Sequence, residues 1–462
     1  MHLTAQVAEG ERLGDSTAPL LSELGPDQFA ALMAACGPFE TKPHLAIGVS
    51  GGSDSLALMF LLNHWLISQG GKLTALTVDH GLRAESAKEA KTVANWASAA
   101  GIEHHVLAWS GVKPSAGIQA AARHARYDLM TEWCRAAGVL HLATAHQLDD
   151  QRETVAMRRA RNPADNFGLA GMSLISARGE VRLLRPLLTV PGAVLKAYLS
   201  ARNMRWLEDP SNQMERFERI RWRRGLEGPL PTLGEIQAWG EARVATEAAI
   251  ADLLARSVSV HEAGFVRIDL APWRAAQADR LPRAHLAPRA LGQLIAMVGG
   301  GDYLPARPAL LRALDTLLSG GAGLTLGGTL IGVWRGQGLI CREPFAVTEE
   351  VQADSLIDCL WDRRFRVTTA GNWKGGRIGV LGERGLAEIG QIPDFRLKDR
   401  DIPLPARAAL PAVRDATGRL IAVAHLGFDP YEQGSNVQFS FRPHYSATSS
   451  GFTVAYGWPH TI

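Results

Sequence analysis

The fold is decided by the stretch His44–Val49, HLAIGV, which leads directly into Ser50–Ser55, SGGSDS, and then into an apolar run from Leu56 to Leu62. The first segment predicts a buried strand and the last predicts the start of a helix. Two glycines between them let the backbone turn tightly, and free amides with serine hydroxyls at a helix N-terminus face a negative charge. The stretch therefore predicts a phosphate-binding loop, with a serine-capped helix after a tight turn as the plainer alternative.

This loop differs from the Gly-x-x-x-x-Gly-Lys-Ser/Thr form that holds a terminal phosphate, because no lysine follows its glycines. Asp54 stands instead where a carboxylate can hold a magnesium ion against phosphates. The residues alone therefore predict a phosphate-bearing ligand together with its metal.

Working outward, short apolar runs alternate with helix-like stretches from about Thr41 to Leu188. This alternation predicts βαβ units and an α/β fold with a mostly parallel sheet, whose ligands bind beyond the carboxyl ends of the strands. The expected strands are Leu45–Val49, Leu73–Val78, Val106–Trp109, Val139–Ala145 and Val181–Leu187, and the expected helices are Ser53–Gln69, Ala84–Ala100 and Ala116–Ala137.

Polar residues follow two of these strands. Asp79 ends the second strand, where it can meet a ribose, a metal or a base, or equally cap the next helix. After the fourth strand, His146, Asp150 and Glu153 share one face if the segment is helical. They can coordinate a metal or grip a cationic substrate, and the alternative is a surface helix with acidic residues in its first turn.

The length and composition bound the remaining possibilities. With 462 residues, at roughly 100–200 per domain, several domains are expected. We expect them at 1–227, at 228–345 (mainly helical) and at 346–462 (smaller and β-rich). The run Leu56–Leu62 is far short of the ~20 apolar residues that span a bilayer, so no membrane contact is expected. Four cysteines without a CxxC pair favour a reducing, cytoplasmic compartment.

Charge is unevenly distributed along the chain. The net charge is +3, yet residues Arg152–Gly225 contain fifteen Lys and Arg against seven Asp and Glu. A positive patch within a near-neutral protein is typical of a nucleic-acid footprint, and a solvated helical face is an equally weighted alternative.

The ordered set of motifs resembles the N-type ATP pyrophosphatases and, within them, the tRNA(Ile)-lysidine synthase family. The resemblance covers about residues 41–224, with a PP-loop domain of the adenine nucleotide α-hydrolase-like fold. The segments that carry it are Ser50–Ser55, Val78–Arg83, Ala121–Tyr127, His146–Thr154, Gly168–Met172, Arg185–Leu188, Trp206–Asn212 and Phe217–Arg221.

The resemblance implies an ATP-dependent ligase that forms a carbon–nitrogen bond. Free L-lysine is joined to C2 of the wobble cytidine of the tRNA(Ile) with anticodon CAU, through an adenylated tRNA, with release of pyrophosphate and AMP. The product changes codon specificity from AUG to AUA. ATP and Mg²⁺ are the implied cofactors, the two later domains are implied to bind tRNA, and a homodimer stays open as the assembly.

The resemblance also assigns roles to residues. Asp54, Arg126, His146, Asp150 and Glu153 match catalytic positions, of which Asp150 and Glu153 hold the lysine and Asp54 holds the metal. ATP binding falls to Ser50, Gly51, Gly52, Ser53, Asp54, Ser55 and Asp79, and tRNA binding to Arg219, Arg221 and Arg223.

The sequence departs from the family's pattern at one loop, and several other functions remain as alternatives to the one that the resemblance implies. Met157–Phe167, MRRARNPADNF, lacks the glycine that the family usually has after its Glu-Thr pair, which leaves the RNA contacts of this loop open. A PP-loop tRNA thiolase, another adenylating synthetase and a nucleotide-sensing binding protein are the competing functions. A thiolase needs a reactive cysteine, and Cys134 is expected to be a core thiol.

Overall fold

The computed structural model describes residues 24–81, 86–111, 113–114, 117–161, 167–207, 229–278, 286–353, 358–369, 376–392, 401–432, 434, 436–448 and 451–457. They form two compact units. The first contains the chain up to Arg243 together with the segment from Phe452 onward, and the second contains Val244–Gly451. The division into three domains at 227 and 345 stays a prediction.

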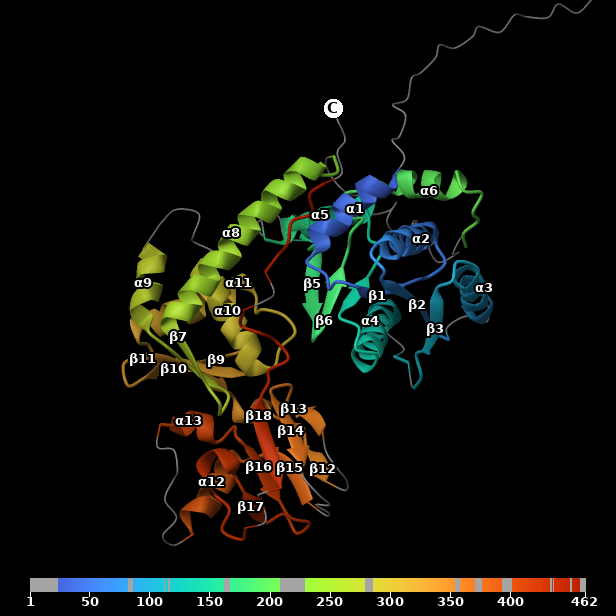
Figure 1. Cartoon of the computed structure of the whole chain (residues 1–462). Helices are drawn as coiled ribbons and strands as arrows, with labels where there is room; N and C mark the ends of the chain where they lie inside the picture. The colour runs from blue at the N-terminus through green and yellow to red at the C-terminus, as the bar shows by residue number, and fades with distance from the viewer. Residues whose placement is uncertain are drawn as a thin grey trace, which may run out of the picture. The chain divides into compact units, whose positions relative to one another are not determined.

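The first unit is built on a six-stranded sheet (Figure 1). Its order is β3 (Glu103–Ala108), β2 (Lys72–Asp79), β1 (His44–Gly48), β4 (His141–Ala143), β6 (Val181–Leu184) and β5 (Ile175–Arg178). All neighbours pair in parallel except β5 and β6, which form an antiparallel hairpin at one edge. The predicted α/β class with a mostly parallel sheet is confirmed, and β5 is an edge strand that the prediction lacked.

Helices cover both faces of this sheet. Successive side chains of a strand point to opposite faces, so Leu45 and Ile47 pack with one helical layer while Ala46 packs with the other. The first layer contains α1 (Pro26–Cys36), α2 (Ser53–Ser68), α3 (Ser86–Ala99) and α6 (Gly192–Ser200), and the second contains α4 (Ile118–Ala136). α5 (Leu148–Arg161) packs through Val155 against Leu169 of the short helix η1 (Gly168–Ala170).

The second unit begins within α8 (Leu233–Ser257) and contains a five-stranded antiparallel sheet. The sheet order is β7 (Val258–His261), β8 (Phe265–Ile268), β11 (Gln337–Arg342), β10 (Thr329–Trp334) and β9 (Leu324–Leu326). Val266 and Ile340 pack with α9 (Leu270–Ala278), α10 (Leu286–Gly299) and α11 (Arg307–Ser319), whereas Phe265 and Leu339 face the C-terminal part of the unit.

That C-terminal part contains two smaller antiparallel sheets. One contains β12 (Val351–Ala353), β15 (Gly376–Val380), β16 (Pro411–Arg414) and β17 (Leu420–Ala422), and the other contains β13 (Asp358–Trp361), β14 (Phe365–Thr369) and β18 (Val437–Phe441). The short helices are η3 (Pro344–Ala346), α12 (Gly382–Gly390), α13 (Leu404–Arg407) and η4 (Ala424–Leu426). The predicted helical middle region and β-rich end are confirmed.

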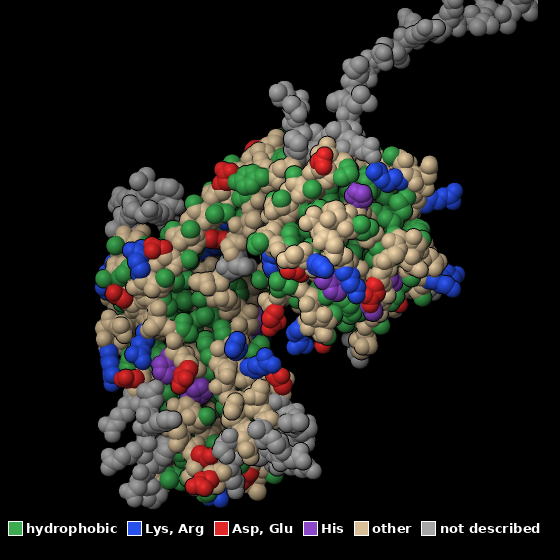
Figure 2. All heavy atoms as spheres, viewed as in Figure 1, with side chains coloured by type: hydrophobic (Ala, Val, Ile, Leu, Met, Phe, Trp, Pro, Cys, Tyr) green, Lys and Arg blue, Asp and Glu red, His purple; other side chains and the backbone are tan. Residues whose placement is uncertain are grey.

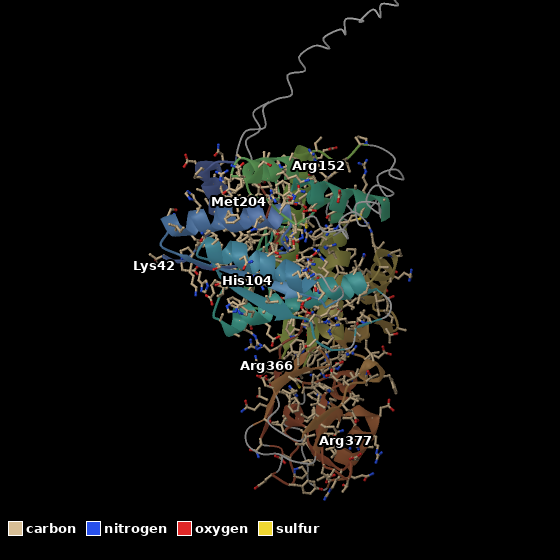
Figure 3. All side chains as sticks on the ribbon, turned by 90° about the vertical axis from the view of Figure 1, so that its right-hand side faces the viewer. Lys42, His104, Arg152, Met204, Arg366 and Arg377 are labelled. Carbon is tan, nitrogen blue, oxygen red and sulfur yellow. The ribbon has the colours of Figure 1, made fainter. Side chains whose placement is uncertain are left out.

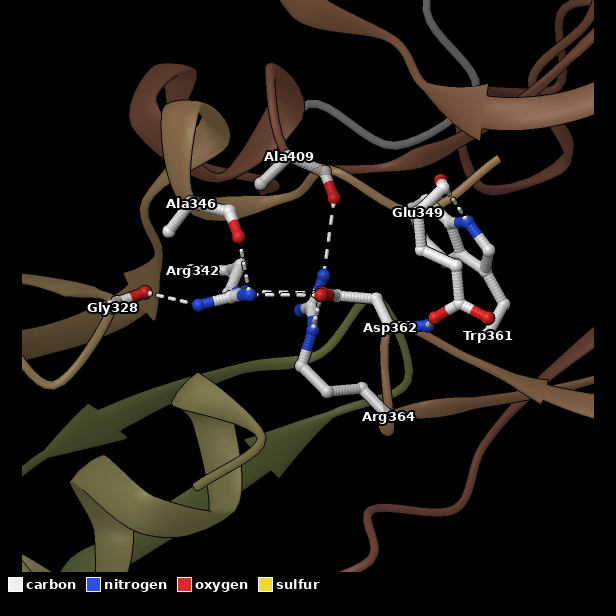
Figure 4. Close-up of polar contacts among 8 residues, drawn as sticks. All are labelled: Gly328, Arg342, Ala346, Glu349, Trp361, Asp362, Arg364 and Ala409. Atoms are coloured by element: carbon white, nitrogen blue, oxygen red, sulfur yellow. Dashed lines mark hydrogen bonds and ion pairs between the residues drawn. The ribbon is translucent and has the colours of Figure 1, made fainter. Parts of the chain in front are cut away.

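A buried ionic cluster joins these elements (Figure 4). Asp362 accepts hydrogen bonds from Arg342 Nε at 3.0 Å and Nη2 at 2.8 Å, and from Arg364 Nε at 2.6 Å. The same two arginines donate to the carbonyls of Gly328, Ala346 and Ala409. Because each charge has partners, the cluster fixes the end of β11 against the turn between β13 and β14.

On the face drawn in Figure 2, basic and acidic side chains are interspersed. In the second unit Arg366 and Arg377 (Figure 3) pair with Asp358 and Glu350. Within the part of the chain that the structure describes, no helix has the length and apolarity needed to cross a bilayer.

Candidate functional site

A cavity of about 660 Å³ lies at the carboxyl ends of β1 and β4 in the first unit. Its walls come from the SGGSDS loop, the starts of α2, α5 and α6, the middle of α4, and Trp206 with Leu207. This is the position that ligands take in parallel α/β sheets. Of the predicted site residues it brings together Ser50, Gly52, Ser53, Asp54, Ser55, Arg126, His146, Asp150 and Glu153.

The loop owes its shape to Gly51 and Ser55. Gly51 has φ +87°, and a Cβ at this position would lie 2.6 Å from Leu207 Cδ1. Ser55 Oγ accepts a hydrogen bond from the Ser50 N–H at 3.3 Å and donates one to the Gly52 carbonyl at 3.0 Å. α2 begins at Ser53, within this loop, and the first amides of a helix lack partners within it. Gly52 and Ser53, at this helix start, line the cavity. The loop therefore forms an anion-binding wall.

Asp54 is a cavity-lining acid with a raised pKa. Burial raises its pKa to about 6, and the nearby Asp150 carboxylate acts in the same direction. A hydrogen bond from Ser53 and the positive charge of Lys196 oppose this rise. A cation near Asp54 would stabilise its ionised form, which is the electrostatic setting of a metal-binding carboxylate.

α5 starts with a reciprocal capping arrangement. Gln147 Oε1 accepts the Asp149 N–H at 2.6 Å, and Asp150 Oδ2 accepts the Gln147 N–H at 3.0 Å. Because the helix begins at Leu148, His146 precedes it, and only Asp150 and Glu153 share a helical face. The condition for a shared face, a helical segment, therefore holds for Asp150 and Glu153 and does not hold for His146, yet all three residues line the cavity.

Cations line the cavity from α4 and α6. Arg123 Nη2 lies 3.5 Å from His146 Nε2, and Arg126 Nη2 lies 3.5 Å from His80 Nε2. Lys196 adds a positive charge from α6. The cavity thus combines carboxylates from α2 and α5 with guanidinium groups from α4, a distribution suited to a ligand that carries both phosphates and an ammonium group.

Several predicted residues lie elsewhere. Asp79 does not line the cavity; its Oδ1 accepts the Gly81 N–H and the Ser86 hydroxyl, each at 2.8 Å, and these bonds lower its pKa. Its role in ATP binding stays a prediction, and the capping alternative matches these contacts. Gly51 shapes the loop from outside the cavity lining. Arg219, Arg221 and Arg223 lie outside the described residues.

The sequence interpretation missed Lys196 and Trp206 as cavity-lining residues. A signal for Lys196 existed, since it is the only lysine between Lys113 and Lys374 in an arginine-rich chain. Trp206 also had a signal, because it begins the segment Trp206–Asn212 that carries the family resemblance.

The described residues of the site include neither a metal-binding cluster nor a reactive thiol. Among the described residues, no group of three or more His, Cys, Asp or Glu side chains is arranged to hold a metal ion. Burial raises the pKa of Cys36 and of Cys134 to about 12, and neither lines the cavity. The thiolate that a sulfur-transfer mechanism needs is therefore strongly disfavoured at both positions.

Comparison with known proteins gives a consistent result. The family of the PP-loop domain matches residues 26–229. A tRNA(Ile)-lysidine synthase of Ruegeria pomeroyi is 38% identical over 387 residues, which cover 81% of this chain and 87% of that protein. The proteins of the same name from Brucella anthropi and Brucella suis biovar 1 are 32% and 35% identical, covering 90% and 85% of this chain and 93% and 88% of theirs.

Proposed function

The chain belongs to the tRNA(Ile)-lysidine synthase family of ATP-dependent ligases, and we propose that its cavity joins free L-lysine to the wobble cytidine of the tRNA(Ile) with anticodon CAU. One observation carries this proposal. A phosphate-binding loop, two carboxylates able to hold an ammonium group and two arginines line one cavity of about 660 Å³.

ATP lies with its phosphates on the loop in this proposal. The amides at the start of α2 and the hydroxyls of Ser50 and Ser53 bind the phosphate oxygens. Arg126, from α4, stabilises the negative charge that develops on the α-phosphate. Asp79 contacts the ribose of ATP only if its side chain gives up its hydrogen bonds with Gly81 and Ser86.

Magnesium fits the donors present. Mg²⁺ is usually held by one or two carboxylates together with phosphates and waters, so a cluster of three protein ligands is not required. Asp54 supplies a partly buried carboxylate whose pKa is raised by burial and by Asp150, and a divalent cation would favour its ionised form. When bound, the metal would neutralise charge on the pyrophosphate leaving group.

Lysine lies against α5. Asp150 and Glu153, one turn apart on the helix and both in the cavity wall, hold its ammonium group. The amine, with a pKa of ~10.4 in water, must lose a proton before it attacks. His146 lines the same cavity beside these carboxylates, so it or a carboxylate takes this proton.

The two steps then share one site. The cytidine O2 forms a bond to the α-phosphorus as the bond to pyrophosphate breaks. The lysine ε-nitrogen next forms a bond to C2, the C2–O2 bond breaks, and AMP leaves with that oxygen. The basic segment after Arg152 and the second unit bind the tRNA in this proposal, and the reaction takes place in the cytoplasm.

A tRNA thiolase is the competing function. The buried, high-pKa thiols of Cys36 and Cys134 count against it.

The test separates the two steps. Purified protein, ATP, Mg²⁺ and a CAU tRNA(Ile) transcript are expected to release pyrophosphate without lysine, and to release AMP in step with labelled-lysine incorporation once lysine is added. Asp54→Ala is expected to abolish both steps. Failure of the unsubstituted protein to incorporate lysine, or transfer of sulfur in its place, would overturn the proposal.

A further inference from the structure

The end of the chain returns to the first unit and packs beside α5. Residues Phe452–Tyr456, here called the C-terminal strap, belong to this unit although they follow the second unit in sequence. The Thr453 N–H donates to Ser173 Oγ at 2.8 Å, and the Thr453 carbonyl accepts the Leu174 N–H at 2.9 Å. Ser173 Oγ also donates to the Thr453 carbonyl at 3.4 Å, so the strap holds the segment Ser173–Leu174 by three hydrogen bonds.

Side chains of α8 hold the other edge of the strap. Gln237 Nε2 donates to the Ala455 carbonyl at 3.1 Å, and the Tyr456 hydroxyl donates to Glu241 at 2.7 Å. The guanidinium of Arg243 lies 4.4 Å from the ring centroids of both Phe452 and Phe167. These contacts along the strap are more than a loose terminus would make.

The segment that the strap holds is in turn bonded to α5. Gln151 Nε2 donates to the Met172 carbonyl at 2.9 Å, and its Oε1 accepts the Met172 N–H at 2.6 Å. Gly171 has φ +71°, and a Cβ there would lie 2.6 Å from Gln151 Oε1, so only glycine permits this approach. Arg158, further along α5, donates to the carbonyls of Gly168 and Gly171.

We infer that the C-terminal strap is a positioning element for the lysine site, acting through Met172 and Gln151 on α5. Gln151 lies between Asp150 and Glu153 in the sequence of this helix, so a shift of the residue 168–174 segment would move the carboxylates that hold lysine. In its described contacts the strap touches no residue of the SGGSDS loop. The anion-binding wall therefore keeps its position when the strap is loosened. This inference rests on the proposed function, because it assigns lysine to Asp150 and Glu153.

Two substitutions in the full chain loosen the strap from opposite sides. Thr453→Pro removes the N–H that donates to Ser173. Gly240→Leu places a side chain from α8 where even a Cβ would lie 3.0 Å from Val454 Cγ2. Thr453→Val is the matched control, since it keeps the backbone N–H and changes only the hydroxyl.

The readout compares the KM for lysine with the KM for ATP in each variant. A displacement on the order of 1 Å at a reacting centre costs about 100-fold. We therefore expect both loosening variants to raise the KM for lysine by about 10- to 100-fold. Lysine-independent pyrophosphate release and the KM for ATP should stay within about twofold, and Thr453→Val should behave as the unsubstituted protein. ATP binding also reports whether a variant has kept its fold.

Two results would overturn the inference. One is an unchanged lysine KM in both loosening variants. The other is a parallel loss of ATP binding and lysine use in both, which would make the strap a stabilising contact only. Lack of lysine incorporation by the unsubstituted protein would instead contradict the proposed function itself, so the two failures are distinguishable.

Discussion

Replacing Asp362 by Asn tests how much the buried ionic cluster stabilises the second unit. The substitution keeps the shape of the side chain and removes its charge. Asp362 has φ +47°, a backbone conformation that Asn also tolerates, so no backbone strain is added. Any loss of stability therefore reports on the charge and its hydrogen bonds.

The expected magnitude follows from the partners of Asp362. Arg342 and Arg364, whose side chains are 9% and 1% exposed, together donate three hydrogen bonds to this carboxylate. An amide offers one oxygen and turns an NH₂ group toward a guanidinium, so at least one buried donor loses its acceptor. Breaking a buried ion pair from one side costs about 3–5 kcal/mol, which is the loss we expect.

Asp358→Asn is the matched control. Asp358 receives Arg366 Nε at 2.8 Å and Nη2 at 2.7 Å, a two-point contact like that of Arg342, but these side chains are 59% and 52% exposed. Exposed pairs contribute about 1 kcal/mol or less. The two variants thus share the substitution and the kind of contact and differ in burial.

The assay is thermal and urea unfolding of the full chain, followed by tryptophan fluorescence. For a unit of this size, Tm falls by about 2–4 °C per kcal/mol, so Asp362→Asn should lower the transition of the second unit by about 6–20 °C. Asp358→Asn should lower it by a few degrees at most. The reasoning is refuted if the two variants unfold within about 1 kcal/mol of each other.

Three further predictions concern the site and the pH dependence of stability. Asp150→Asn should raise the KM for lysine by about 10-fold or more in steady-state assays, because an ammonium–carboxylate contact of about 1.5–3 kcal/mol is lost; an unchanged lysine KM would place the ammonium elsewhere. Lys196→Ala should raise the KM for ATP, because in the proposed complex it removes a positive charge that attracts the phosphates. Lys196→Arg should keep the KM for ATP close to that of the unsubstituted protein. Equal KM values for ATP in the two variants would exclude this role for Lys196. Burial lowers the pKa of His425 to about 4, so the folded state keeps the ring neutral while the unfolded chain binds a proton below about pH 6.5. Stability should be complete above that pH and decline by up to about 3 kcal/mol as the pH falls to about 4, and urea titrations of His425→Phe should lack this decline.

The sequence predicted the features that depend on local chemistry and on parallel topology. The SGGSDS loop, its strand and its helix each have a short-range signal, and parallel strands bring their carboxyl ends to one edge. His146, Asp150 and Glu153 therefore line the cavity with the loop although about a hundred residues separate them in the chain.

Other features depend on contacts that form only with the tertiary fold. Asp79 has a short side chain that can either face a ligand or accept hydrogen bonds from nearby groups of the chain. In the folded protein it accepts the Gly81 N–H and the Ser86 hydroxyl, and these two donors are in reach only once the turn at Gly81 is formed. The contact between Thr453 and Ser173 joins residues 280 positions apart, which no periodicity reveals. Gln151 was adjacent to predicted site residues, yet its bonds to Met172 depend on the same tertiary packing.

The most direct test is mass spectrometry of the nucleoside at the wobble position of a CAU tRNA(Ile) transcript after incubation with the purified protein. We predict a cytidine carrying lysine at C2 when ATP, Mg²⁺ and lysine are all present, and unmodified cytidine when any one of them is omitted or Asp54 is replaced by Ala. An unmodified cytidine in the complete reaction, or a sulfur-containing nucleoside, would contradict the assignment of this cavity to lysine ligation.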